Sequence, residues 1–123
     1  MVRSYRDLEA WKRATLLARD VYAATSMFPS EERFGLTAQM RRSAVSIASN
    51  IAEGHARATT REFLRFISIS LGSLAKLETQ MHIALLLKMG DIPSAGLLHI
   101  EADEIGKMLR SLQSSLRERL QNQ

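Results

Sequence analysis

Apolar residues recur along this chain at intervals of three and four, the spacing that places side chains on one face of an α-helix. Proline and glycine divide the pattern into four stretches, which predict helices over residues 4–27, 30–54, 59–89 and 94–120. No alternating, strand-like run stands out, and the sequence has no Asn-Gly or Asp-Gly hairpin turn. We therefore expect an all-α fold, in which one domain spanning residues 1–123 forms an antiparallel up-and-down four-helix bundle.

Local signals mark the ends of these predicted helices. Thr59 followed by Glu62 fits a capping box at the start of the third helix. Gly54 is the expected C-terminal cap of the second helix, and Pro29 and Pro93 each open a segment. The expected core positions are, in chain order, Trp11, Ala14, Ala18, Val21, Tyr22, Thr25, Leu36, Met40, Ala44, Ile47, Ile51, Phe63, Phe66, Ile67, Ser70, Leu74, Leu77, Met81, Leu85, Leu97, Leu98, Ile105, Met108, Leu109, Leu112 and Leu116.

The second predicted helix has an unusual back, the side opposite its apolar face. A surface helix normally carries charge there. At 100° per residue, this back consists mainly of small residues, namely Ala38, Val45, Ala48, Ser49 and Ala52. Because small residues allow close helix approach, we expect another copy of the chain to cover this side, and Gly72 on the third helix fits the same expectation. The alternative is that alanine simply favours an exposed helix.

A polar stripe runs between these two sides of the second helix and predicts a structural network with the third helix. A carboxylate at the edge of an apolar face needs a partner, so we expect Arg42 to meet Glu53 or Glu78. The members of this predicted network are Gln39, Arg42, Ser46, Asn50, Glu53 and Glu78.

Charge adds a candidate ligand surface. The formal net charge is +4, and 13 of the 17 basic residues are arginine, which favours bidentate contact with phosphate. Arginines gather around the end of the second helix and the start of the third. The candidate nucleic-acid contacts are Arg41, Arg57, Arg61 and Arg65. The alternative is that these side chains are solvated or held in ion pairs.

Catalytic and metal-binding motifs are missing from the sequence. It has no cysteine, no Gly-x-Ser-x-Gly motif and no glycine-rich phosphate loop. A di-iron bundle requires Glu-x-x-His pairs, whereas His82 follows Glu78 by four residues and His55 follows Glu53 by two. We expect no enzyme activity, no metal and no cofactor.

Localisation follows from hydropathy. No apolar run approaches the roughly 20 residues of a membrane-spanning helix. The N-terminal residues contain no apolar signal core, so we expect the protein to be cytoplasmic.

One long block of the sequence, from Gly35 to Gly54, is specific enough to suggest a family. With it, the chain resembles the bacterial four-helix-bundle proteins encoded in intervening sequences of 23S rRNA genes. The remaining residues that carry the resemblance are Leu8, Trp11, Lys12, Tyr22, Phe28-Pro29, Gly72-Ser73-Leu74 and Leu77-Glu78-Thr79-Gln80.

This resemblance implies a homopentameric barrel of up-and-down bundles. A related branch of the family comprises accessory proteins of diversity-generating retroelements, which are basic pentamers that bind nucleic acid and associate with a reverse transcriptase. The chain departs from the family pattern at three positions: Ala48 replaces a frequent proline, Leu71 a frequent arginine and Lys76 a frequent glutamate.

The sequence thus predicts a non-enzymatic homo-oligomer that binds RNA or DNA through its arginine-rich surface. Repeating a weak basic surface in each copy would raise affinity through avidity. A protein-interaction scaffold without nucleic-acid binding is the alternative. A reverse transcriptase would be a partner only if the protein belongs to a retroelement.

Overall fold

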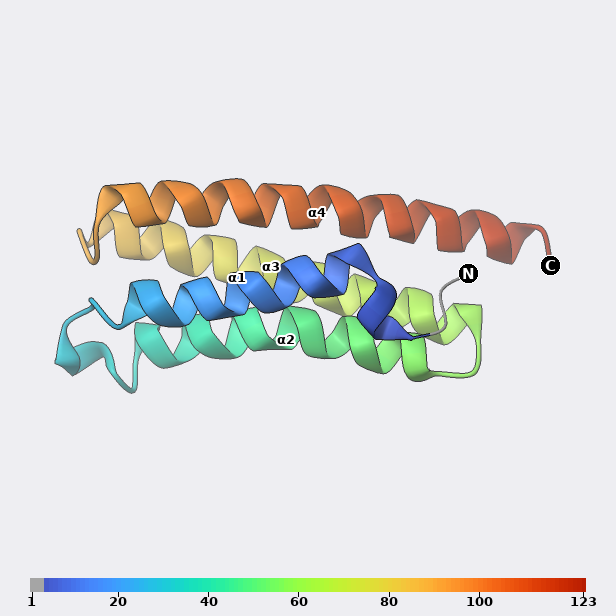
Figure 1. Ribbon diagram of the computed structural model, residues 1–123, viewed down its shortest axis with the longest axis horizontal. Helices are drawn as coiled ribbons and strands as arrows, with labels where there is room; N and C mark the ends of the chain where they lie inside the picture. The colour runs from blue at the N-terminus through green and yellow to red at the C-terminus, as the bar shows by residue number, and fades with distance from the viewer. Residues whose placement is uncertain (1–3) are drawn as a thin grey trace.

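A computed structural model describes residues 4–123 and contains four long helices. Their bounds are Glu9–Thr25 (α1), Leu36–Ala56 (α2), Thr60–Leu86 (α3) and Ile92–Gln121 (α4), with short 3-10 turns at Tyr5–Asp7 and Ser30–Glu32. Successive helices run in opposite directions, and α1 packs against α4 to close the bundle (Figure 1). No strand occurs among the described residues, so the prediction of an all-α four-helix fold is confirmed.

The core runs along the centre of the bundle and receives side chains from all four helices. The largest fully buried apolar side chains are Leu17, Met40, Ile47, Ile51, Ile67, Leu77, Ile105, Leu109, Leu116 and Val21. Leu17, absent from the predicted core, is 0% exposed, whereas the predicted core residues Tyr22, Leu85 and Leu97 are 46%, 43% and 66% exposed. Tyr22 and Leu97 are each adjacent in sequence to a buried residue, and one residue turns a helix by about 100°. Sequence spacing therefore located the apolar faces but misjudged their edges.

The starts of α3 and α4 depend on side chains that accept hydrogen bonds from free backbone N–H groups. Thr59 Oγ1 accepts from the Glu62 N–H at 3.1 Å, as the capping box predicts. Asp91 Oδ1 accepts from the Ser94 N–H at 2.7 Å, which starts α4 at Ile92, two residues before the predicted position. Hydrogen bonds from the backbone N–H and from the side chain of Ser94 hold the pKa of Asp91 below its usual value.

The second helix begins later than predicted. Residues 30–32 form a separate 3-10 turn, and α2 starts at Leu36, whose N–H donates to Glu32 Oε1 at 3.1 Å. The third helix ends at Leu86 rather than at residue 89, because Lys88 and Gly90 have the positive φ angles of 58° and 72°. Those angles lie outside the helical range and turn the chain toward α4.

Gly54 is not the cap that the sequence predicts. It is buried inside α2, which continues to Ala56. A Cβ atom at Gly54 would lie 2.5 Å from Phe66 Cβ and 3.2 Å from Phe63 Cδ1. The glycine therefore allows α2 and α3 to approach closely beside the turn that joins them.

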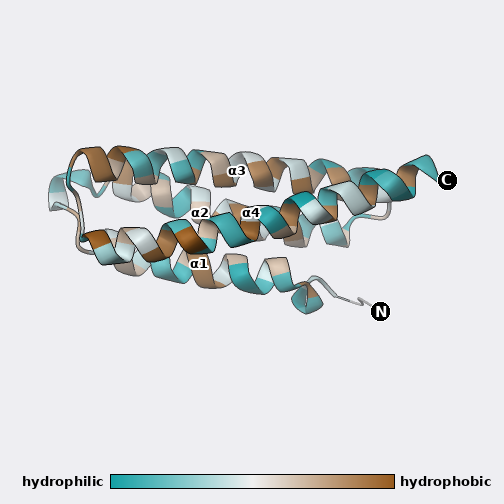
Figure 2. Cartoon of the chain, turned by 90° about the horizontal axis from the view of Figure 1, so that it is seen from above, coloured by the Kyte–Doolittle hydropathy of each residue, from teal (hydrophilic) through white to brown (hydrophobic). Residues whose placement is uncertain are grey.

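The two ends of the bundle differ in polarity. Large exposed apolar side chains gather at the end of the bundle that holds the α1–α2 and α3–α4 connections. They include Phe34, Leu86, Ile92, Leu97 and Ile100. The α3–α4 turn stands out as hydrophobic in Figure 2, while the far end of α4 is mostly hydrophilic. None of the described helices has the length and apolar content needed to cross a membrane.

Candidate nucleic-acid interface

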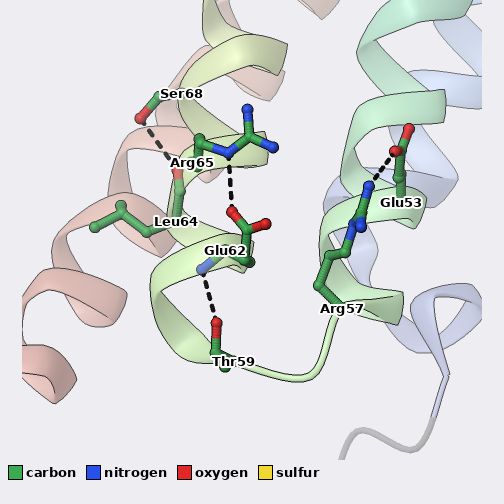
Figure 3. Close-up of polar contacts among 7 residues, drawn as sticks. All are labelled: Glu53, Arg57, Thr59, Glu62, Leu64, Arg65 and Ser68. Carbon is green, nitrogen blue, oxygen red and sulfur yellow. Dashed lines mark hydrogen bonds and ion pairs between the residues drawn. The ribbon is translucent and has the colours of Figure 1, made fainter.

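The turn between α2 and α3 brings three of the four candidate arginines to one end of the bundle. Arg57 is the C-cap residue of α2, while Arg61 and Arg65 lie in the first two turns of α3. Figure 3 shows Arg57 and Arg65 on opposite sides of this turn. We call Arg57, Arg61 and Arg65 the turn arginines.

Two of the turn arginines are held in ion pairs. Arg57 Nη2 lies 2.8 Å from Glu53 Oε2, and Arg65 Nε lies 2.9 Å from Glu62 Oε2. Both guanidinium groups also lie over the ring of Phe66, at 5.0 and 4.7 Å from its centroid. Exposed ion pairs contribute only about 0.2–1 kcal/mol each, so a phosphate group can replace either carboxylate at small cost.

The Arg65 side chain also acts on the ionisation of its partner. Its hydrogen bond, and then the charges of Arg65 and Arg57, lower the pKa of Glu62 below the usual value. Glu62 is therefore ionised at neutral pH and offsets part of the positive charge of this surface.

Arg61 differs from its two neighbours. Its side chain is exposed, and it forms no hydrogen bond or ion pair with any residue in the range 4–123. It lies one helical turn before Arg65, so the two project from the same side of α3. Arg61 therefore contributes an uncompensated charge to the turn.

A hollow of about 470 Å³ adjoins the turn and adds an arginine that the sequence analysis missed. Arg57 and Arg119 line it, together with His55 and the apolar ring of Phe63, which meet edge to face at 5.4 Å. Arg119 comes from the last turns of α4. An antiparallel bundle places the end of α4 beside the α2–α3 turn, so this topology was the available signal.

Arg41 lies apart from the turn arginines. Its Nε donates to Thr25 Oγ1 at 2.9 Å, its Nη2 donates to the Tyr22 carbonyl at 3.2 Å, and its guanidinium lies over the Tyr22 ring. It is separated from Arg57 by 16 residues, roughly 24 Å along α2. Arg41 thus joins α2 to the end of α1, where the Tyr22 carbonyl also accepts from the Ser26 N–H at 3.1 Å.

The predicted polar network forms only in part. Asn50 Nδ2 donates to the Ser46 carbonyl at 2.8 Å and to Ser46 Oγ at 2.9 Å, and Ser46 Oγ lies 2.9 Å from Ser73 Oγ. Ser73, which the prediction omitted, thus connects this cluster to α3. The cluster links α2 and α3 through hydroxyl and amide groups rather than through charges.

The expected partners of Arg42 are wrong. Neither Glu53 nor Glu78 forms an ion pair with it within residues 4–123, and Glu53 pairs with Arg57 instead. Arg42 and Glu53 are 11 residues apart, roughly 16 Å along the helix, which exceeds the reach of the two side chains. Gln39, like Arg42, lines a groove beside α3.

Sequence comparison identifies the family. The profile of the 23S rRNA-intervening sequence protein family matches residues 6–111. The chain belongs to this family.

A crystal structure of another protein has a similar fold. It is a protein of unknown function from the S23 ribosomal protein family of Bacteroides thetaiotaomicron, with 19% sequence identity and a TM-score of 0.76. The match covers 85% of this chain and 97% of that one. No curated protein matches the chain.

The back of α2 in this family member is open only in part. Val45 is 43% exposed and Ser49 is exposed, but Ala48 is only 8% exposed. The placement of Ala48 on the back is therefore wrong, since it belongs to the core cluster. On α3, a Cβ atom at Gly72 would meet nothing within 4 Å, so packing within one chain does not require this glycine.

Metal-ligand residues are scattered in this family member. Within residues 4–123, no three His, Cys, Asp or Glu side chains lie close enough together to hold a metal ion.

Proposed function

We propose that this family member is a non-enzymatic homo-oligomer that binds RNA or DNA through the turn arginines. The observation that carries the proposal is the unpaired, exposed Arg61, which lies one turn from Arg65 at the start of α3. Phosphate contacts dominate the affinity of proteins for nucleic acid. Arginine in particular binds phosphate with two parallel hydrogen bonds.

The surroundings of the turn favour a polyanion. The ion pairs of Arg57 and Arg65 are exposed and inexpensive to exchange. Arg119 extends the positive surface onto α4, and the rings of His55 and Phe63 provide planar groups beside it. Aromatic rings beside cations are typical of surfaces that bind single-stranded nucleic acid.

Assembly would multiply these contacts. We propose that copies associate through the back of α2, where Val45 and Ser49 are exposed, and through α3 around Gly72. A pentamer is the assembly that the family resemblance implies. Light scattering at low and high salt tests it: a mass of about five chains that salt leaves unchanged supports a pentamer, and a monomer contradicts any assembly.

A gel shift with single-stranded and double-stranded RNA and DNA tests nucleic-acid binding. We expect a shift at low salt that weakens as salt is added. Arg61→Ala/Arg65→Ala should weaken binding at least tenfold and lower the salt slope by about 2, because each arginine that binds a phosphate accounts for a slope of about 1.

The matched control also removes two arginine charges, but from the opposite half of the bundle. Arg19→Ala/Arg33→Ala changes two exposed arginines that lie outside the turn and should leave the shift within about twofold of the unmodified protein. Equal losses in both variants would reduce the effect to net charge and contradict a site at the turn. No shift at low salt in the unmodified protein would contradict nucleic-acid binding altogether.

A protein-interaction scaffold is the second candidate, because the opposite end of the bundle exposes large apolar side chains. Phe34 is 84% exposed and Ile92 is 80% exposed. Exposed apolar surface of this kind marks interaction sites in folded proteins. If this second function holds, the unmodified protein should give no gel shift, and Phe34→Ser/Ile92→Ser should abolish its complex with a protein partner.

A further inference from the structure

A second polar site lies between α2 and α3, away from the turn arginines. It is a groove of roughly 430 Å³, a volume within the usual range for small-ligand sites. All the residues that line it are polar and none is acidic; they include Gln39, Arg42, Ser43 and Ser46 from α2, with Ser73 and Lys76 from α3. We call it the α2–α3 groove.

Its two cations are not neutralised. Arg42 and Lys76 are both exposed, and neither forms a hydrogen bond or ion pair with any described residue. Arg57 and Arg65 at the turn, in contrast, each have a carboxylate within 3 Å. Two unpaired cations that face one groove from opposite helices create a positive potential that attracts an anion.

Hydroxyl groups in the groove have hydrogen atoms to donate. Asn50 Nδ2 contacts the Ser46 carbonyl, which only accepts, so this contact fixes the orientation of the Asn50 amide. The same nitrogen donates to Ser46 Oγ, which shares a single hydrogen bond with Ser73 Oγ. Since each hydroxyl carries one hydrogen, one of these two serines still has a hydrogen to give.

Ser43 supplies a second free hydroxyl. Ser43 as a whole is only 7% exposed, and its hydroxyl forms no hydrogen bond with any described residue. Ser73, across the groove, is 6% exposed. The Ser43 hydroxyl lines the groove and is not one of the buried polar atoms that lack a partner, so its hydrogen is available to a ligand there.

Gln80 completes the wall of the groove on α3. Its Oε1 atom is buried and has no hydrogen-bond donor among the described residues. The Gln80 amide therefore adds an unsatisfied polar group to this wall of the groove.

We propose that the α2–α3 groove binds a terminal phosphate group, as carried by inorganic phosphate or a phosphate monoester. Such a group has two negative charges near neutral pH, which match Arg42 and Lys76. Its oxygens point in tetrahedral directions, and the donors come from both walls of the groove. A carboxylate has only two coplanar oxygens, and a backbone diester has a single charge. The inference does not rest on the turn arginines.

Isothermal titration calorimetry of the full chain with inorganic phosphate at about pH 8, where the dianion dominates, tests the proposal. We expect saturable binding that Arg42→Gln/Lys76→Gln weakens by at least about tenfold, since charge-assisted hydrogen bonds are removed. Ser43→Ala should weaken it by a smaller factor, roughly two- to tenfold. The matched control Arg61→Gln/Arg65→Gln should bind phosphate as the unmodified protein does.

Further probes identify the source of the phosphate. A 5′-phosphorylated thymidine octamer that binds more tightly than both its unphosphorylated form and inorganic phosphate would assign the groove to nucleic-acid ends. Equal affinity for inorganic phosphate and the phosphorylated octamer would assign it to free phosphate. Either result supports a phosphate site.

Several results would overturn it. These are no binding of inorganic phosphate, binding that ignores Arg42→Gln/Lys76→Gln, and acetate binding as strongly as phosphate. If the double variant lowers the solution mass while the unmodified protein binds no phosphate, the groove faces an acidic group of a neighbouring copy. Amide NMR shifts at Ser43 and Ser73 on adding phosphate to the unmodified protein provide a readout that needs no variant.

Discussion

The same two helices, α2 and α3, form two basic surfaces with opposite organisation. At the turn, the helices are so close that Gly54 has no room for a Cβ atom, and Arg57 and Arg65 are paired with carboxylates. Farther along, the helices enclose the α2–α3 groove, where Arg42 and Lys76 have no acidic partner among the described residues.

The difference shows that the number of arginines in a stretch of sequence does not indicate how much positive charge is free to bind an anionic ligand. The turn arginines come from a dense stretch of the chain, but two of them interact with acids three or four residues away. Arg42 and Lys76 are 34 residues apart in sequence, and only the antiparallel pairing of α2 with α3 brings them to one groove.

We expect the largest effect from adding a side chain at Gly54, where α2 and α3 are in close contact at the turn. Gly54→Ala gains about 1 kcal/mol of helix propensity, but its Cβ would overlap Phe66 Cβ, and overpacking costs typically 1–3 kcal/mol or more. Because no rotamer change can relieve a Cβ–Cβ overlap, we expect the upper end of that range and hence a net loss of roughly 1–2 kcal/mol in the free energy of unfolding. Urea unfolding measures it, and an unchanged midpoint would mean that the helices separate there without strain.

The next effect concerns the hydroxyl contact beside the groove. Ser73→Ala removes the hydrogen bond to Ser46 across the two helices, so the free energy of unfolding should fall by about 1 kcal/mol. Ser114→Ala, at an exposed serine of α4, is the control and should change it by less than about 0.5 kcal/mol. Similar losses in both variants would show that the contact between Ser46 and Ser73 contributes nothing specific.

Local chemistry explains what the sequence predicted correctly. Thr59 and Glu62 are three residues apart, so their capping contact does not depend on the rest of the fold. Glu53 and Arg57 are four apart at the end of one helix, and this spacing favours the observed ion pair. The prediction offered Glu53 or Glu78 to Arg42, but Glu53 lies about three helical turns from Arg42 on the same helix.

Errors arose where the outcome depends on another helix. Gly54 resembled a helix cap because glycine often ends helices, but its role comes from Phe66 on α3. Leu97 fits the apolar spacing of α4, yet it lies on a side that no other helix covers and is 66% exposed. The sequence indicated the α2 wall of the α2–α3 groove as a polar stripe, but it did not indicate the α3 wall with Ser73 and Lys76, which belongs to a different helix.

We expect a smaller effect of opposite sign on the free energy of unfolding when Gly72 rather than Gly54 is replaced. Gly72 lies on α3 where an added Cβ meets no atom within 4 Å. Gly72→Ala should therefore raise the free energy of unfolding of the single chain by about 0.5–1 kcal/mol. Light scattering with Gly72→Leu then separates chain stability from assembly: a lower mass would place Gly72 in a contact between copies, and an unchanged mass would exclude it from one.

The smallest effect is the pH dependence of the turn. The pKa of Glu62 is lower in the folded chain than in the unfolded chain, so its contribution to stability is present above the ordinary glutamate pKa of about 4.3 and is lost as the pH falls through the lower folded value. Glu62→Gln should remove that part of the acid dependence, measured by urea unfolding between about pH 2 and 6. An unchanged pH profile in this variant would mean that the contact with Arg65 has no influence on folding.

The order of the helices also has a kinetic consequence. Three of the four packed helix pairs join consecutive helices, and only α1 with α4 brings distant segments together. Chains with mostly local contacts fold within microseconds to milliseconds. We expect α2, α3 and their serine contact to form early and α1 to dock on α4 late, so that Leu17→Ala accelerates unfolding more than it slows folding in stopped-flow experiments.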